Sequence, residues 1–263
     1  MPMNQGAFSA LVAPDIRKVY FEVGKERPLE YPLVFNVSDM EWNPVTDRQI
    51  SGLSTLQTMN EGASFTLDEA IMGGSKAYLA GGFGLAIEIT WVMWRDDLYG
   101  VMREMAAELA RASRNRQEVD AWSVLNNAFS TTSVGFTASE ALCGAHTGLD
   151  GVVRRNRPTV DIEFSVVGLQ NSVGRYESMT NERGLPRLMA PTMAVLTPAY
   201  KWAAREILGS TGKPYSTDNE RNALIEEDLS WMVSHYITTS TYWFLLAAQG
   251  IHDLNFLWRD HPI

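Results

Sequence analysis

The chain has 263 residues, 45% of them apolar and 10% aromatic, enough to bury a sizeable core in one large domain or two modest ones. Its formal net charge of −9, from 31 acidic and 22 basic residues, argues against the concentrated basic face that binds nucleic-acid phosphates. The single cysteine, Cys143, excludes an intrachain disulfide framework, and no window approaches the roughly 20 apolar residues of a membrane span.

The first 44 residues are predicted to form an extended arm. They contain five prolines: Pro2, Pro14, Pro28, Pro32 and Pro44. Proline removes a backbone N–H donor and clashes with the preceding helical turn, so only short helices fit between these positions.

A long β-hairpin is predicted to follow the arm. From Lys76 to Met93 the odd positions are mostly apolar and the even positions mostly small or polar, which is the period-two pattern of a strand. Residues 46–59 are predicted to be its partner strand, and residues 60–75 its tip. Such a hairpin is only marginally stable unless its apolar face packs against another surface.

Residues 96–129 are predicted to form one long amphipathic helix. Asp96 and Asp97 place acids at its N-terminus, where a capping oxygen and the helix dipole favour negative charge. Apolar residues recur every three or four positions, and Arg114 and Glu118 have the spacing of an i,i+4 ion pair. Unbroken, the helix would have roughly 34 residues and a length of about 50 Å, which suits a strut.

The second half is predicted to be a compact α+β layer structure. Residues 130–158 read as loop with short strands, and residues 160–179 as an amphipathic helix closed by Gly184 and Pro186. A buried strand at 190–198 and a helix at 199–208 follow. Residues 229–248 contain two apolar runs about a polar turn, which predicts a hairpin.

No catalytic, cofactor or metal site is predicted. Residues 209–214 lack the spacing of a phosphate-binding loop, and the glycines at 81–84 indicate a bend in a strand. The histidines lack metal-ligand spacing, and His235 is expected to be a hydrogen-bonded core residue. Cys143 is expected to be a small buried residue, and Glu88 a carboxylate on the solvent face of a strand.

Four segments carry a resemblance to a known family: "DDLYG" at Asp96, "VLNNAF" at Val124, "RGLP" at Arg183 and "DNERNAL" at Asp218. Together with the order of arm, hairpin and helices, they make the chain resemble the major head subunit of Mu-like phages and prophages from about Tyr31 to Trp258. The resemblance implies an α+β chain with the HK-97-like capsid fold.

The resemblance also implies a division of the chain into four parts. These are an N-terminal arm and lead-in at 1–44, an extended loop at 45–92, a peripheral domain at 93–131 and 240–263 that contains the spine helix, and an axial domain at 132–239. Family members usually continue past this C-terminal sequence, so the peripheral sheet is expected to be incomplete or completed differently.

The implied function is structural, with no enzymatic activity and no cofactor. Copies of the chain would form pentamers and hexamers of an icosahedral virion capsid, assembled in the host cytoplasm around double-stranded DNA. Portal, scaffold and decoration proteins are implied partners, DNA would be contacted non-specifically, and no membrane is involved. Contacts between subunits are expected from residues of the hairpin and the long helix: Leu53, Leu56, Met59, Glu61, Phe65, Asp68, Lys76, Arg103, Arg111, Arg114 and Glu118.

Two alternative functions remain open at this point. A nanocompartment shell of the same fold would enclose a cargo enzyme instead of DNA, and a cytosolic hydrolase would need a site that no motif reveals. Some relatives crosslink a hairpin lysine to a neighbour's asparagine, but Lys76, the only hairpin lysine, is expected to be a solvated lysine at a strand edge.

Overall fold

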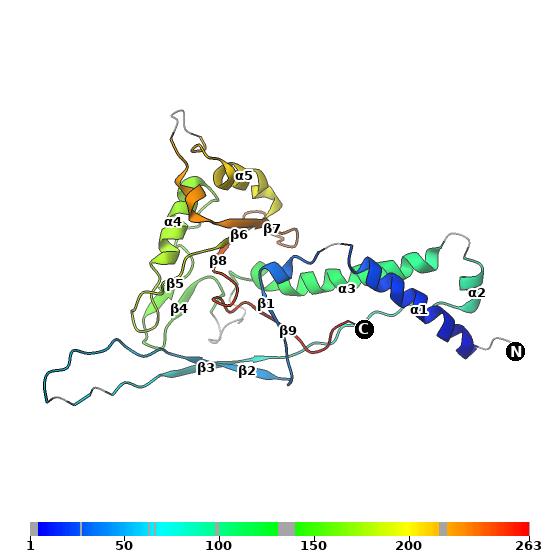
Figure 1. Cartoon of the computed structure of the whole chain (residues 1–263), viewed down its shortest axis with the longest axis horizontal. Helices are drawn as coiled ribbons and strands as arrows, with labels where there is room; N and C mark the ends of the chain where they lie inside the picture. Colours follow the sequence, from blue (N-terminus) through cyan, green and yellow to red (C-terminus); the bar gives the residue numbers. More distant parts are fainter. Residues whose placement is uncertain are drawn as a thin grey trace.

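The subunit combines one long helix, a small sheet covered by helices, and a projecting loop (Figure 1). The computed structural model describes residues 5–26, 28–62, 64–65, 67–97, 100–130, 140–215 and 220–262. The chain contains both helices and strands, and its strands pair in small separate sheets, which confirms the predicted α+β class.

The long helix is α3, Val101–Asn126, with 26 residues. It is shorter than the predicted helix at 96–129 and has a length of about 39 Å at 1.5 Å per residue. Gly100 has a left-handed φ of 70°, which breaks the helical conformation directly before α3. The Asp97 carboxylate accepts hydrogen bonds from the N–H groups of Val101 and Met102, each at 2.9 Å, so this acid caps the helix from outside it.

A separate short helix, α2 (Trp91–Arg95), precedes α3, and the Thr90 side chain caps it. The resemblance motif that starts at Asp96 lies between the two helices, and its Leu98 and Tyr99 fall outside the described residues. The sequence therefore predicts a long helix correctly but places its start at 96 instead of 101 and its end at 129 instead of 126.

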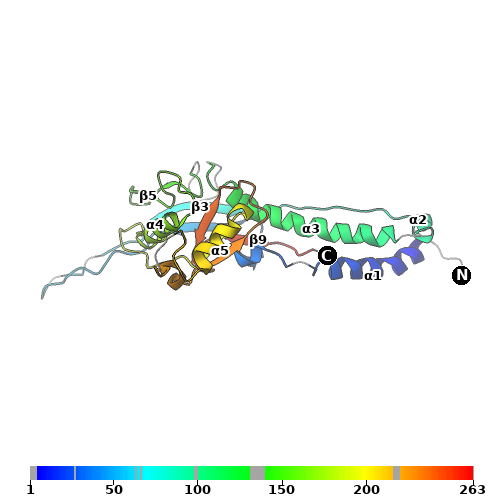
Figure 2. The same ribbon diagram turned by 90° about the horizontal axis from the view of Figure 1, so that it is seen from above.

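Helix α1 (Gln5–Val23) occupies the segment predicted to be an extended arm. Pro14 lies inside this helix of 19 residues, so the prediction from proline spacing is wrong. α1 packs along α3 (Figure 2), and Arg103 of α3 forms an ion pair with Asp15 at 3.6 Å. Packing of this kind can outweigh a local preference, because most helical stability in proteins comes from tertiary contacts.

The predicted hairpin is present with a shorter ladder. Strands β2 (Val45–Ile50) and β3 (Met72–Tyr78) pair antiparallel, with Val45 opposite Tyr78. Residues 79–90, predicted to continue the strand, run as extended chain along α3, and within the described part of the chain no strand pairs with them (Figure 2). Alternation of apolar residues predicts extended backbone, but it does not show where a partner strand stops.

Two strands far apart in the sequence form a second small sheet beside α3. β1 (Asn36–Asp39) pairs in parallel with β9 (Asn255–Trp258). The short helix η1 (Tyr31–Leu33) precedes β1, and the rings of Tyr31 and Phe256 lie 4.6 Å apart between centroids. The lead-in and the C-terminal strand therefore pack as one unit.

A three-stranded sheet organises the second half. Its order is β7 (Ser230–Val233), β6 (Met193–Leu196), β8 (Trp243–Leu246), with β6 parallel to β7 and antiparallel to β8. The predicted strand at 190–198 is confirmed, but the predicted hairpin at 229–248 is wrong because β6 lies between its two strands. Ala194, Val195 and Leu196 are fully buried, and a strand that is apolar on both faces gains most from the centre of a sheet.

Helices α4 (Val166–Glu177) and α5 (Lys201–Gly209) pack on this sheet (Figure 1). α4 is shorter than the predicted helix at 160–179 because Ser165 caps it and accepts a hydrogen bond from Gly168 N at 3.1 Å. Gly184 has a left-handed φ of 77°, but it lies in a later turn and does not end the helix. The remaining elements are η2 (Pro198–Tyr200), η3 (Ala223–Glu227) and the hairpin of β4 (Ala145–Thr147) and β5 (Val153–Arg155).

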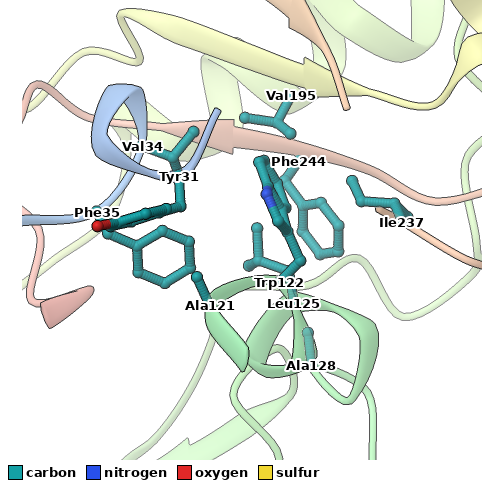
Figure 3. Close-up of a cluster of buried hydrophobic side chains, with 10 residues drawn as sticks. All are labelled: Tyr31, Val34, Phe35, Ala121, Trp122, Leu125, Ala128, Val195, Ile237 and Phe244. Carbon is teal, nitrogen blue, oxygen red and sulfur yellow. The ribbon is translucent and has the colours of Figure 1, made fainter. Parts of the chain in front are cut away.

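Two buried clusters form the core. One surrounds Trp122, where the end of α3 meets Phe35, Val195 and Phe244 from three other segments (Figure 3). The other joins α4, α5 and the sheet around Leu169, Leu196 and Ile207. Strand β6 contributes Val195 to the first cluster and Ala194 and Leu196 to the second, so it lies between them.

Candidate assembly surfaces

The loop between β2 and β3 leaves the ladder at Ile50 and returns at Met72. It projects well away from the rest of the subunit in both views (Figures 1 and 2). Its apolar side chains lie in solvent, with Leu56, Leu67 and Phe65 exposed at 101%, 92% and 82%. A run of exposed large apolar residues of this kind is the usual signature of an interaction site.

The structure brings five of the predicted contact residues together on this loop: Leu53, Leu56, Met59, Glu61 and Phe65, all exposed. Lys76 differs, because it lies half-buried inside β3 opposite Asp47. It is therefore part of the ladder and not a fully solvated lysine.

Asp68 lies at the base of the loop and bonds to the opposite arm. Its Oδ2 accepts hydrogen bonds from Ser54 N at 2.6 Å and from Ser54 Oγ at 2.8 Å. These bonds, together with the charge of Arg183, hold the pKa of Asp68 below its usual value. Asp68 thus has a role within its own subunit that the sequence does not reveal.

A second candidate surface is an apolar groove beside α3. Leu85 and Ile87 of the extended segment form one wall, and Met105, Leu109 and Ala112 of α3 form the other. The groove has a volume of about 350 Å³. Glu104 and Glu108 also line the groove, so two acidic side chains lie among its apolar residues.

The predicted contact arginines of α3 bind acids within the subunit. Arg111 pairs with Glu104 at 2.8 Å, Glu108 at 2.5 Å and Glu26 at 3.7 Å, and the hydrogen bonds to Glu104 and Glu108 raise its pKa. Arg103 pairs with Asp15, as described above. The side chains of both arginines remain 44% or more exposed, so each can still meet a neighbour. Arg114 also interacts within the subunit.

Glu118 is not an exposed contact residue, and this part of the prediction is wrong. It is 3% exposed and accepts hydrogen bonds from the backbone N–H groups of Glu30 and Tyr31, at 2.5 and 3.1 Å. A third comes from Trp122 Nε1 at 2.9 Å. Burial raises the pKa of Glu118, and the hydrogen bonds oppose that rise.

A signal for the burial of Glu118 exists in the sequence. Trp122 follows it by one helical turn, and a buried indole N–H requires an acceptor. The buried face of α3 is lined by small and large apolar residues on both sides of Glu118: Met102, Ala106, Ala107, Ala110, Ala121, Trp122 and Leu125. Val119, which the periodic pattern assigns to this face, is exposed.

Cys143, His235 and the acidic residues are among the side chains that could act as nucleophiles, acid–base groups or metal ligands. Cys143 is half-buried, and desolvation raises the pKa of its thiol to about 11. His235 is largely exposed, contrary to prediction, and its Nδ1 lies 3.1 Å from Glu30 Oε1. Among the residues that the structure describes, no three His, Cys, Asp or Glu side chains lie together where they could hold a metal ion.

In the described ranges, no helix combines the length and apolar character that crossing a bilayer requires.

Solved structures show the same fold. A chain in the capsid of bacteriophage JBD30 decorated with minor capsid protein trimers aligns with a TM-score of 0.56 and 12% identity, covering 81% of this chain and 92% of that one. A chain in the procapsid of the same phage aligns with a TM-score of 0.50 and 15% identity, covering 89% and 100%. At this identity the likeness shows the fold alone.

Sequence comparison identifies the family. No curated protein matches the sequence significantly. The family model described as phage capsid protein matches residues 75–260, from β3 to beyond β9, which is more than half of the chain. This match favours a phage shell over a nanocompartment shell or a hydrolase. The chain belongs to the phage capsid protein family and is a structural subunit of a virion shell.

Proposed function

We propose that the chain is the major head subunit of a Mu-like phage with the HK-97-like arrangement, and that it forms pentamers and hexamers of an icosahedral shell. Assembly in the host cytoplasm around double-stranded DNA belongs to the same proposal. The net charge of −9 supports a container that holds DNA without binding it tightly. Portal, scaffold and decoration proteins are the proposed partners, and minor capsid protein trimers decorate the JBD30 capsid.

We also propose a division of the chain into four parts, which follows the observed elements. Residues 1–44 serve as arm and lead-in, and residues 45–92 as the extended loop. The spine helix α3 and the β1–β9 sheet support a peripheral domain at 93–131 and 240–263, and the three-stranded sheet supports an axial domain at 132–239. Strand β8 (Trp243–Leu246) lies within the peripheral range 240–263, but it pairs with β6, so we move this strand to the axial domain.

The exposed apolar loop carries the proposal. An isolated subunit leaves Leu56, Phe65 and Leu67 almost fully in water, far from its own core. Burying a side chain of this size contributes about 1.5–3 kcal/mol, so contact between the loop and another copy would favour assembly strongly. Permanent interfaces typically bury more than about 2,000 Å², and a projecting loop supplies area that a compact subunit lacks.

The groove beside α3 is the proposed receiving surface for the loop of a neighbouring copy. Its apolar walls, Leu85, Met105 and Leu109, match the apolar side chains of the loop. Both features belong to every copy, so one contact can repeat around a ring, as a heterologous interface requires.

The experiment shortens the loop without touching its base. Residues 55–67 are replaced by a short Gly-Ser turn, which leaves the β2–β3 ladder and the Ser54–Asp68 bonds in place. The subunit is expected to keep its circular dichroism spectrum and melting temperature but to stop forming shells in sedimentation velocity. Shells of normal yield from this variant would contradict the proposal.

A matched control separates loop contacts from a general loss of apolar surface. The triple variant Leu56→Ser, Phe65→Ser, Leu67→Ser removes three exposed apolar side chains from the loop, and Leu188→Ser removes one that is 98% exposed elsewhere. We expect the triple variant to assemble poorly and Leu188→Ser to assemble normally.

A further inference from the structure

The loop is held at its base by one side chain from the axial half of the subunit. Arg183 Nε donates a hydrogen bond to the backbone oxygen of Gly52 at 3.1 Å, and Nη2 donates to the backbone oxygen of Glu69 at 2.7 Å. Gly52 lies on the outgoing arm of the loop and Glu69 on the returning arm. The guanidinium therefore links both arms to each other and to the turn that carries it.

The acidic group nearest to Arg183 strengthens this link. Asp68 Oδ1 lies 3.6 Å from Arg183 Nη2, while its Oδ2 accepts the two hydrogen bonds from Ser54. The side chains of Arg183 and Asp68 are 21% and 31% exposed, so water weakens their attraction only in part. Five residues therefore meet here: Gly52 and Ser54 from the outgoing arm, Asp68 and Glu69 from the returning arm, and Arg183 from the turn.

The turn that presents Arg183 has a defined shape. Thr180 and Pro186 form a β-bridge across it, and Gly184 takes a left-handed φ of 77°. The Asn181 side chain accepts hydrogen bonds from the N–H groups of Arg183 and Leu185, each at 2.9 Å. Arg183 is therefore fixed at the tip of a tight turn, and this accounts for the "RGLP" segment.

Two further contacts bring the axial half close to the ladder at this point. Gln49 of β2 donates a hydrogen bond to Glu182 Oε1 at 2.5 Å. A Cβ at Gly73 of β3 would lie 2.7 Å from a side-chain methyl carbon of Leu149, so the Leu149 side chain lies close against the backbone of β3. The turn after α4 reaches down to the place where the loop leaves the ladder (Figure 1).

We propose that Arg183 is a positioning residue that fixes the direction of the loop relative to the axial half, and so determines where the loop meets a neighbouring copy. The second part of this inference rests on the proposed function. Arg183 donates hydrogen bonds to main-chain oxygens of the loop, so these two bonds do not depend on which side chains the loop carries. The planar guanidinium can reach two carbonyl groups at once, whereas the single ammonium of lysine cannot span them in the same way.

The test compares Arg183→Ala and Arg183→Lys with Arg187→Ala. Arg187 directly follows the same turn and is exposed, and its replacement by alanine changes the net charge by the same amount as Arg183→Ala. Hydrogen exchange of residues 51–54 and 68–71 is measured on the unassembled subunit. Losing a charged hydrogen-bond donor is expected to speed exchange there about tenfold in Arg183→Ala and nearly as much in Arg183→Lys. Exchange in Arg187→Ala should equal that of the natural protein.

Assembly is then measured on the same three variants by sedimentation and electron microscopy. We expect Arg183→Ala to keep its melting temperature but to yield fewer closed shells with a wider range of diameters. Unchanged exchange in Arg183→Ala overturns the inference, and so does faster exchange with shells of normal yield and diameter. Failure of the natural protein to assemble would instead contradict the proposed function and leave the exchange result to decide the role of Arg183.

Discussion

The carboxylate of Glu118 and the indole N–H of Trp122, one helical turn apart on α3, are joined by a hydrogen bond of 2.9 Å in the interior of the subunit. The same carboxylate accepts the N–H groups of Glu30 and Tyr31, which open the turn before β1. One buried acid therefore fastens the N-terminal lead-in to α3, and the aromatic cluster around Trp122 closes over it.

Glu118→Ala is expected to destabilise the subunit. It leaves the buried N–H groups of Tyr31 and Trp122 without an acceptor, which should lower the free energy of unfolding by about 2 kcal/mol or more. Chemical denaturation followed by circular dichroism measures this on the unassembled subunit. Glu108→Ala is the control, because Glu108 is exposed on the same helix and its ion pair contributes at most about 1 kcal/mol. Equal effects from both variants would show that the Glu118 bonds are unimportant.

The buried position of Glu118 also predicts a dependence on pH. Its pKa is raised in the folded state, so the folded subunit binds this proton more tightly than the unfolded chain does. The stability that the folded subunit gains from protonated Glu118 is fully present below the ordinary pKa of 4.5 and is lost as the pH rises through the folded pKa. The free energy of unfolding of the natural protein, relative to that of Glu118→Gln, should therefore fall as the pH rises from 4. A flat difference over that range would contradict the raised pKa.

The sequence predicted the elements whose patterns are local. The long helix, the buried strand at 190–198 and the β2–β3 hairpin all follow from apolar periodicity. The order β7-β6-β8 could not be predicted in this way, because it depends on which strand gains most from a central position. Helix α1 was missed since its contact with α3 outweighs the effect of Pro14.

In the candidate surfaces, the exposed apolar residues were predicted better than the charged residues. Exposed apolar residues such as Leu56 can be recognised because nothing in the hairpin pattern covers them. Charged residues give no such signal, so Asp68 and Glu118 were assigned to neighbours although each bonds within its own subunit. The resemblance motifs mark positions that organise turns. Asn126 bonds Tyr236 O at 2.9 Å, and the buried Asn222 bonds Ile207 O at 2.6 Å.

Helix α3 should not tolerate proline at its centre. Ala110 is 1% exposed in the middle of the helix, so Ala110→Pro removes a backbone hydrogen bond and clashes with the preceding turn, at a cost of about 3 kcal/mol or more. We expect insoluble or unassembled protein. Ala110→Gly keeps the N–H group and should cost about 1 kcal/mol, with shells still forming. Normal shells from Ala110→Pro in electron microscopy would show that a continuous α3 is unnecessary.

The extended segment beside α3 is attached by Arg116, whose guanidinium carbon lies 4.0 Å from the ring centroid of Phe83. A double-mutant cycle with Arg116→Ala and Phe83→Leu should give a coupling of about 0.5–1 kcal/mol, the usual range for an exposed cation–π pair. Arg116 also pairs with Asp120 at 2.6 Å, so Asp120→Ala in a parallel cycle with Phe83→Leu controls for that bond. Chemical denaturation of the unassembled subunit supplies all the free energies. If the first cycle gives no more coupling than the second, the ring does not hold the arginine and the groove wall needs another support.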